Sequence, residues 1–424
     1  MRRPRVVGPS AAVLASLAAG VLALACGTES GTTGDSGGED AATSAATSTA
    51  TPGIPTGQLR TPTPERSAEE QDRIDGYAIR LTLPDVDLSN RTVPLRELES
   101  GGVGADSGIP SIHNPAFESV ERAADWIGSR EPVIALEVGG EARIYPIQIL
   151  IWHEVVNDEL GGQPVLVTFC PLCYTAIVFD RRVDGDVRDF GVSGLLRESD
   201  LVLYDYQTTT LWQQLTGEAI VGTDAGERLR LLPAQLVAFE DARAQYPDAL
   251  VLSRETGFSR SYGSNPYAGY DDIDSIPIFT TSFVSGGLLP AKAQVLTFEV
   301  EDQAVAIPFD RLSQEVVVET SVGGVPVVAL WQHGTNAALE AGAVRDGRDI
   351  GSAGAFRADV DGVPVRFEAR DGAIFDTGTG SRWNVLGTAV EGPLAGTRLE
   401  PLVSGTHFWF IWAVFKPDTV VLVE

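Results

Sequence analysis

The sequence predicts a β-rich α+β protein made by tandem duplication of one small domain, so that two lobes follow a signal peptide and a disordered tether. The main observation is an alignment without gaps of residues 135–167 with residues 297–329, a shift of 162 residues (297 − 135). Within it, Glu, Pro and Gly residues coincide, as in Pro146 and Pro308. His153, however, lies opposite Glu315.

The later part of each copy provides the second observation. After a gap of about one residue, Trp212 lies opposite Trp383 and Leu229 opposite Leu399, and YPDALVL is matched by KPDTVVL. A period this long is typical of two like domains, because solenoid units are shorter. We therefore predict repeat 1 over 132–254, a connector over 255–293 and repeat 2 over 294–424.

Local patterns predict the elements of each copy in order. PVIALEV and EARIY flank a Gly-Gly turn and predict a hairpin. Residues 146–156 carry apolar residues at helical spacing with proline in the first turn, which predicts a short helix. PVLVTF predicts a buried strand that runs into CPLC, and further short strands and a second helical piece end the unit. Residues 71–131 are expected to form an N-terminal cap.

The first 26 residues have the pattern of an export signal. Arginines precede an apolar stretch, Val13–Ala25, that is short for a membrane span, and Ala25 stands directly before Cys26. This pattern is typical of a bacterial lipoprotein with Cys26 as the lipidation site; an ordinary cleavable signal is the alternative. Residues 27–70 have almost nothing to bury and predict a disordered tether. We expect an exported protein that is attached to the extracytoplasmic face of the membrane through its lipid anchor.

The charge of the chain excludes one class of partner. A formal net charge of −27 would repel nucleic acid, so no nucleic-acid partner is expected. The same charge is consistent with solubility outside the cytoplasm.

FCPLCYTAIVFDR is the sharpest local motif. Cys170 and Cys173 could chelate one soft metal ion or form a dithiol couple, but one pair supplies at most two ligands. The best third ligand is His153, because its predicted helix precedes the strand that leads to Cys170. This set of ligands would suit Cu or Zn. Glu154 or Asn157 could then hydrogen-bond to the ligands and orient them.

Other interpretations of the motif remain open. The two cysteines could form a structural disulfide, since disulfides are common in exported proteins, or they could be free, inert thiols. Redox activity is less favoured because no helix start follows the motif to lower a thiol pKa. An enzyme with a thiolate nucleophile would need His153 beside a sulfur. No familiar catalytic motif occurs, so enzymatic activity stays open and a non-catalytic function is favoured.

In a non-catalytic module, the disulfide would stabilise the fold. A small-molecule or protein ligand would bind in the cleft between the lobes. His333 stands near the place of CPLC in the second copy and is interpreted as a turn residue. His407 adjoins the aromatic run FWFIWAVF, which favours a core strand over an aromatic ligand pocket. Trp212 and Trp383, shared by both copies, are expected to pack the cores.

The region from FCPLCYTAIVFDRR to LWQQLTGEAIVG, with SYGSNPYAGY and the closing FWFIWAVFKPDTVV, closely resembles the bacterial and archaeal domain of unknown function 3179 family. The resemblance implies an exported protein and no established reaction. Members commonly have glycine after the second cysteine, where this chain has Tyr174. Glycine readily takes a positive φ, so its replacement argues against a rubredoxin-like metal turn.

Overall fold

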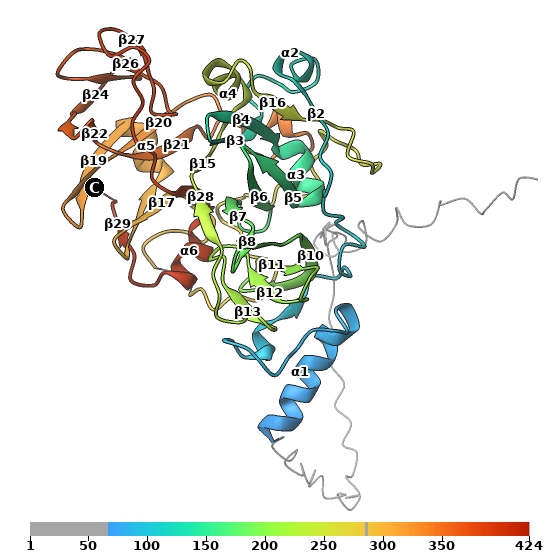
Figure 1. Ribbon diagram of the computed structural model, residues 1–424. Coiled ribbons are helices and arrows are strands. Elements are labelled where there is room, and N and C mark those ends of the chain that lie inside the picture. The colour runs from blue at the N-terminus through green and yellow to red at the C-terminus, as the bar shows by residue number, and fades with distance from the viewer. Residues whose placement is uncertain (1–66, 285–286, 424) are drawn as a thin grey trace, which may run out of the picture. The chain divides into compact units, whose positions relative to one another are not determined.

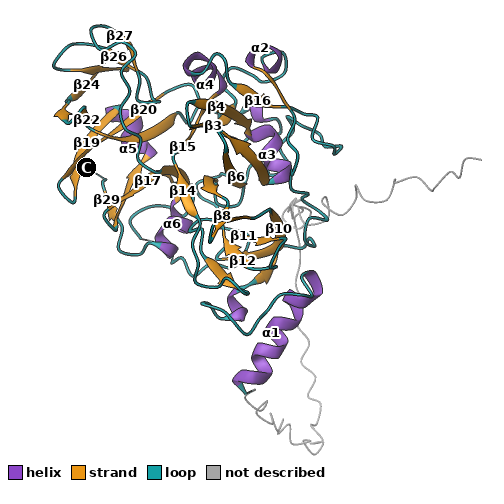
Figure 2. Cartoon of the chain, in the orientation of Figure 1, coloured by secondary structure: helices purple, strands orange, loops and turns teal. Residues whose placement is uncertain are grey.

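The computed structural model describes residues 67–284 and 287–423, which are rich in β-strands and have mostly short helices (Figures 1 and 2). The predicted β-rich α+β class is confirmed. None of the helices in these two ranges is long and apolar enough to cross a membrane. The signal peptide, Cys26 and most of the tether lie outside the described residues.

The chain enters the described part through helix α1 (Ala68–Thr82). The side chain of Ser67 accepts a hydrogen bond from the Glu70 backbone N–H and caps the helix. The last residues assigned to the tether therefore begin α1. Two short strands of the N-terminal segment pair with later strands: β1 (Glu99–Ser100) with β10 (Phe190–Arg197), and β2 (Phe117–Ser119) with β16 (Leu250–Leu252).

The N-terminal half, residues 132–254, begins with the predicted hairpin, β3 (Pro132–Val138) and β4 (Glu141–Pro146). It lies in a sheet of order β15-β3-β4-β16-β2, in which β3 pairs antiparallel with β15 (Ala234–Ala238) and β4 pairs parallel with β16 (Leu250–Leu252). The C-terminal half, residues 294–424, has the order β28-β17-β18-β29 with the same strand directions. Its strands are β17 (Gln294–Val300), β18 (Gln303–Pro308), β28 (Ser404–Phe408) and β29 (Val420–Val421).

Short helices follow corresponding strands of the two halves. Helix α3 (Ile147–His153) follows β4, and α5 (Phe309–Glu315) follows β18. In the same way, α4 (Phe239–Gln245) follows β15 and α6 (Trp409–Phe415) follows β28. The remaining helical turns are α2 (Val120–Ala123), η2 (Leu95–Glu97) and η3 (Val344–Asp346).

Among the described residues, two larger sheets and one two-stranded sheet in each half complete the fold; the two-stranded sheets are β8-β9 in the N-terminal half and β22-β23 in the C-terminal half. The larger sheets of the N-terminal half are β14-β7-β6-β5 and β1-β10-β11-β12-β13, and those of the C-terminal half are β19-β20-β21 and β24-β25-β26-β27. The N-terminal strands are β5 (Val155–Leu160), β6 (Gln163–Cys170), β7 (Thr175–Asp180), β8 (Arg182–Val183), β9 (Asp186–Val187), β10 (Phe190–Arg197), β11 (Asp200–Asp205), β12 (Leu211–Gln213), β13 (Ala219–Val221) and β14 (Arg230–Leu232). The C-terminal strands are β19 (Val317–Val322), β20 (Val325–Gln332), β21 (Ser352–Arg357), β22 (Asp359–Val360), β23 (Val363–Pro364), β24 (Phe367–Arg370), β25 (Ala373–Asp376), β26 (Arg382–Trp383) and β27 (Ala389–Glu391).

The two halves share contacts and part of a core. Strand β15 packs against β21 of the C-terminal half, β28 packs against β7 of the N-terminal half, and β15 and β28 contact each other (Figure 1). Ala306, Phe408 and Ile411 belong to the same buried apolar cluster as the residues around Cys170. The connector, residues 255–293, touches both halves: the Tyr262 hydroxyl bonds His153, and the Asn265 amide donates to the Ala341 carbonyl.

Candidate metal site

The CPLC motif forms a tight turn between two paired strands. Cys170 ends β6, Thr175 begins β7, and the two are paired in the antiparallel register. The Cys173 and Tyr174 backbone N–H groups donate to the Cys170 and Pro171 carbonyls, each at 3.3 Å. Both cysteines are buried, and their thiols are not joined in a disulfide.

Tyr174 takes the role that glycine would have after this turn. Its φ is 56°, in the left-handed region, which costs a non-glycine residue about 1–2 kcal/mol. The ring is fully buried and packs edge-on against Phe169, at 6.0 Å between centroids, and against Phe408 at 5.4 Å. Burial of the ring offsets the backbone strain, so the turn forms although the expectation from the sequence disfavoured it here.

Asp200 is the third member of the site. It begins β11, directly after Glu198 and Ser199, which have φ values of 56° and 65° and reverse the chain between β10 and β11. Its Oδ2 accepts from the Gln213 amide at 2.6 Å and from the Leu215 backbone N–H at 2.9 Å. Its Oδ1 is buried and has no hydrogen-bond partner among the described residues.

The ligand atoms of Cys170, Cys173 and Asp200 all lie within 4.8 Å of one another, and all three residues are buried. Two thiols and a carboxylate at this spacing could hold one metal ion. The Cys173 thiol also donates to the Ser199 carbonyl at 3.2 Å, which joins the CPLC turn to the β10–β11 turn.

Burial governs the protonation of this group. It raises the pKa of both thiols, and the neighbouring Asp200 charge raises them further. Burial also raises the pKa of Asp200 to about 6. Three buried anions packed together are unfavourable, and a bound cation would reverse this by stabilising the ionised forms.

Glu154 and two connector tyrosines interact electrostatically with the group. Glu154 ends α3 with φ 57°, and burial raises its pKa to about 8. Its charge also acts on Cys170. The Tyr267 hydroxyl lies 3.5 Å from its Oε1. Burial raises the pKa of Tyr270, and the charges of Cys173 and Cys170 raise it further.

His153 occupies a different position from the one expected. Its Nδ1 lies 2.7 Å from the Pro110 carbonyl, and its Nε2 lies 2.7 Å from the Tyr262 hydroxyl. It is not part of the group formed by Cys170, Cys173 and Asp200. Glu154 follows α3 with a left-handed backbone and turns the chain there. Its carboxylate acts on Cys170, while the His153 imidazole contacts Pro110 and Tyr262.

Asn157 does not support His153 either. Its side chain exchanges two hydrogen bonds of 2.8 Å with the backbone of Phe190 and so fastens β5 to β10. His333 is exposed and lies 3.7 Å from the Asp349 carboxylate. Among the predicted site residues, the structure thus brings together Cys170 and Cys173, and it adds Asp200.

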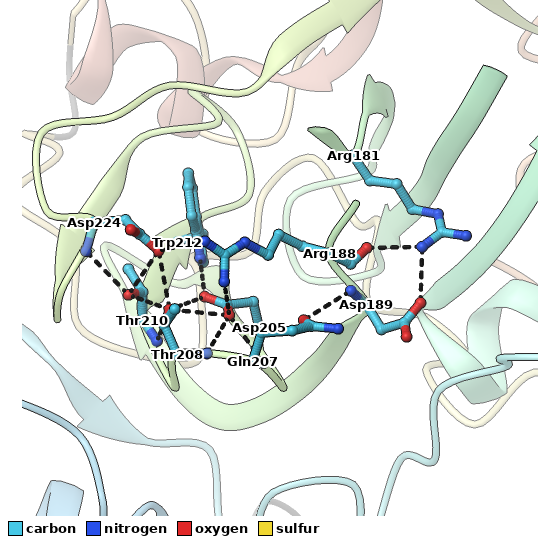
Figure 3. A network of polar contacts seen from close by, with 9 residues as sticks. All are labelled: Arg181, Arg188, Asp189, Asp205, Gln207, Thr208, Thr210, Trp212 and Asp224. Atoms are coloured by element: carbon cyan, nitrogen blue, oxygen red, sulfur yellow. Dashed lines mark hydrogen bonds and ion pairs between the residues drawn. The ribbon is translucent and has the colours of Figure 1, made fainter. Parts of the chain in front are cut away.

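A second polar cluster surrounds Asp205 (Figure 3). Asp205 Oδ2 accepts from the Trp212 indole at 3.0 Å and from the Thr208 hydroxyl at 2.8 Å, and Thr208 contacts Thr210 at 2.7 Å. Asp376 accepts in the same way from Trp383 at 3.1 Å and from Thr379 at 2.8 Å, and Thr379 contacts Ser381 at 2.7 Å. Because both halves have this arrangement, it is part of the scaffold, as expected for the two tryptophans.

The family model described as "Protein of unknown function (DUF3179)" matches residues 106–419. The match spans most of the chain and includes the CPLC turn, Asp200 and the connector, so the chain belongs to this family. No curated protein and no solved structure matches it.

Proposed function

We propose that this member of the family of unknown function is an exported, lipid-anchored protein that binds one zinc ion through Cys170, Cys173 and Asp200. The observation that carries the proposal is the buried group of three ligand atoms within 4.8 Å, of which Asp200 Oδ1 has no other partner among the described residues. A buried carboxylate oxygen without a donor is unfavourable, and a metal ion would supply its missing interaction.

The ligand types favour zinc over copper. Zinc accepts thiolate sulfur together with carboxylate oxygen in tetrahedral sites. Copper(I) prefers soft ligands. A carboxylate oxygen is a harder ligand than the expected imidazole, so this set suits copper(I) less well. Glu154 is the other acidic residue whose charge acts on Cys170, and it or water would provide a fourth ligand.

The surroundings favour a structural ion over a reactive thiol centre. Burial raises the pKa of both thiols, so little thiolate exists without a metal, and thiolate is the nucleophile. His153 has hydrogen-bond partners at both ring nitrogens and is not placed to activate a sulfur. An ion here would join the CPLC turn to the β10–β11 turn, and we favour a non-enzymatic role.

We also infer that the two halves arose by duplication. The matching sheet orders and the paired networks of Asp205 and Asp376 support this inference. Gln332 and Thr335 stand at the positions of Cys170 and Cys173 in the C-terminal half under the shift of 162 residues. The metal site would then belong to one half only.

Export and anchoring are supported by the sequence of the first 26 residues, which ends in LALAC. Cys26→Ser should move the protein from the membrane fraction to the soluble extracytoplasmic fraction. Retention of the variant in the membrane fraction would contradict lipid anchoring at this residue.

The metal proposal is tested on the full chain purified without reductant or chelator. We expect about one equivalent of zinc per chain, two titratable thiols from Cys170 and Cys173 after denaturation with chelator, and loss of zinc in Cys170→Ser and in Cys173→Ser. Thr335→Ala, at the corresponding position of the C-terminal half, is the control and should retain zinc. A metal-free protein in which these two thiols are absent would support the disulfide alternative and overturn the proposal.

A further inference from the structure

Helix α1 presents an apolar stripe to solvent. Ile74, Tyr77 and Leu81 are spaced by three and four positions, so they lie on one face of the helix. Their exposed fractions are 41 %, 66 % and 69 %. A single exposed apolar residue needs no explanation, whereas three in a row along one helix face form a surface that an apolar partner would cover.

The other face of α1 fixes the helix to the folded body. Ile79 and Leu83 are buried in an apolar cluster that also contains Leu88 and Leu95. Gly76 permits this close packing, because a Cβ at this position would lie 2.6 Å from the Leu88 side chain. The stripe is therefore kept exposed by the packing of the opposite face.

A groove of about 370 Å³ adjoins the stripe at Tyr77 and is rich in arginine. Arg73, Arg80 and Arg91 line it, and Asp72 is the only acidic residue of the lining. Asp72 forms an ion pair with Arg91. Three arginines and one aspartate give the lining a net charge of +2, although the whole chain has a net charge of −27.

The remaining two arginines of the groove are available to an anionic group. Arg80 donates to the Val86 carbonyl at 3.4 Å, and neither Arg73 nor Arg80 forms an ion pair within the part of the chain that the structure describes. The Arg80 charge acts on Asp87, but this carboxylate accepts hydrogen bonds of 2.6 and 2.9 Å from Ser89. Guanidinium groups bind phosphate oxygens through paired hydrogen bonds, so this pair of arginines suits a phosphate group.

The position of α1 in the sequence indicates which surface it would meet. Residues 27–66 separate it from Cys26, the proposed lipidation site. A lipid anchor keeps the folded body close to the membrane, so even a weak contact with that membrane becomes effectively intramolecular. Helices that lie in a membrane interface have an apolar face for the acyl boundary, with arginine or lysine beside it for the headgroups.

We propose that α1 docks on the phospholipid surface to which the chain is anchored. Ile74, Tyr77 and Leu81 enter the interface, and Arg73 and Arg80 bind lipid phosphates. The proposal rests on the lipid anchoring proposed above. Docking through a helix that is packed on the body would fix the orientation of the body relative to the membrane, which a tether alone does not do.

The acidic residues of the chain decide which lipid is suitable. Glu69 and Glu70 lie in the first turn of α1, where they interact favourably with the helix dipole, and the chain as a whole is acidic. A strongly anionic surface would repel the protein, whereas phosphatidylcholine presents phosphate groups without a net charge. Phosphatidylcholine is therefore the probe lipid.

The test is quenching of tryptophan fluorescence by brominated phosphatidylcholine, in vesicles that carry the lipid-anchored chain. Tyr77→Trp places a fluorophore in the stripe. Val363→Trp, at a residue of the C-terminal half that is 64 % exposed, is the matched control. After subtraction of the wild-type signal, we expect the brominated lipid to quench the tryptophan introduced at position 77 and to leave the one at position 363 unquenched.

Further changes in the Tyr77→Trp protein test the two parts of the surface. Ile74→Ser with Leu81→Ser should lower the ratio of docked to undocked protein by about tenfold, because it removes apolar side chains from the interface. Arg73→Gln with Arg80→Gln should lower this ratio by about fivefold, since exposed ionic contacts contribute modestly. Val363→Ser with Val390→Ser, which changes two exposed valines of the C-terminal half, should leave it unchanged.

Unquenched fluorescence at position 77, equal quenching at positions 77 and 363, or unchanged quenching after Ile74→Ser with Leu81→Ser would each overturn the proposal. Failure of the anchoring gives a different result, because the chain would then not float with the vesicles. In that case the Cys26 thiol is coupled to a maleimide lipid, which the buried Cys170 and Cys173 do not reach, and the same quenching is measured. The two failures are thus distinguishable.

Discussion

The backbone N–H of Ala338 donates a hydrogen bond of 3.0 Å to the hydroxyl of Tyr174, the residue that follows the CPLC turn. Both residues are fully buried, and they belong to different halves of the chain. A second bond, from the Phe408 N–H to the Cys173 carbonyl at 2.9 Å, holds the same turn. The C-terminal half, which has no cysteines, therefore positions the cysteines of the N-terminal half.

Tyr174→Phe should destabilise the protein by about 1–3 kcal/mol, because it leaves the buried Ala338 N–H without its acceptor. Denaturant unfolding of the full chain measures the change. Tyr77→Phe is the control, since Tyr77 is exposed on α1 and should unfold as the wild type does. Equal stability of wild type and Tyr174→Phe would show that this bond contributes nothing to joining the halves.

Asp205→Asn and Asp376→Asn should each reduce the free energy of unfolding by about 2 kcal/mol, since each weakens hydrogen bonds from an indole and a hydroxyl to a buried carboxylate. Chemical denaturation gives the two losses, and metal analysis should find zinc retained in both variants. Loss of zinc in Asp205→Asn alone would contradict our assignment of this network to the scaffold.

His407→Val should make stability less dependent on pH. The pKa of His407 is about 3 in the folded protein and about 6.5 when unfolded, so below pH 6.5 the unfolded state binds the proton and stability falls as the pH falls. This residue alone should cost the wild type about 2 kcal/mol between pH 7 and pH 5. Urea unfolding of both proteins at the two pH values checks this; identical losses would show that His407 is not held neutral by burial.

Much of the fold could be predicted because the signals were local. The hairpin of β3 and β4, the helix α3 and the strand before Cys170 each follow from turn residues and apolar spacing within a few positions. The interlocking of the halves could not be predicted, since the contacts of β15 with β21 and of β28 with β7 join residues more than 100 positions apart.

The same distinction applies to the residues of the proposed metal site. The cysteines are three residues apart and were visible as a pair, whereas Asp200 is one of 58 acidic residues and reaches them only through the β10–β11 turn. His153 lies near Cys170 in the sequence, but the left-handed backbone of Glu154 at the end of α3, which no local sequence signal predicts, turns the chain there. Tyr174 has a positive φ, which is usual for glycine, and the packing of its buried ring stabilises this backbone conformation.

X-ray absorption at the zinc edge, on the zinc-loaded full chain, tests the central proposal most directly. We expect two Zn–S distances of about 2.3 Å with oxygen ligands at about 2.0–2.2 Å, and no imidazole contribution. His153→Gln should give the same spectrum, and Asp200→Asn should lose zinc or its oxygen ligand. An imidazole signal that disappears in His153→Gln, with an unchanged spectrum for Asp200→Asn, would contradict the account.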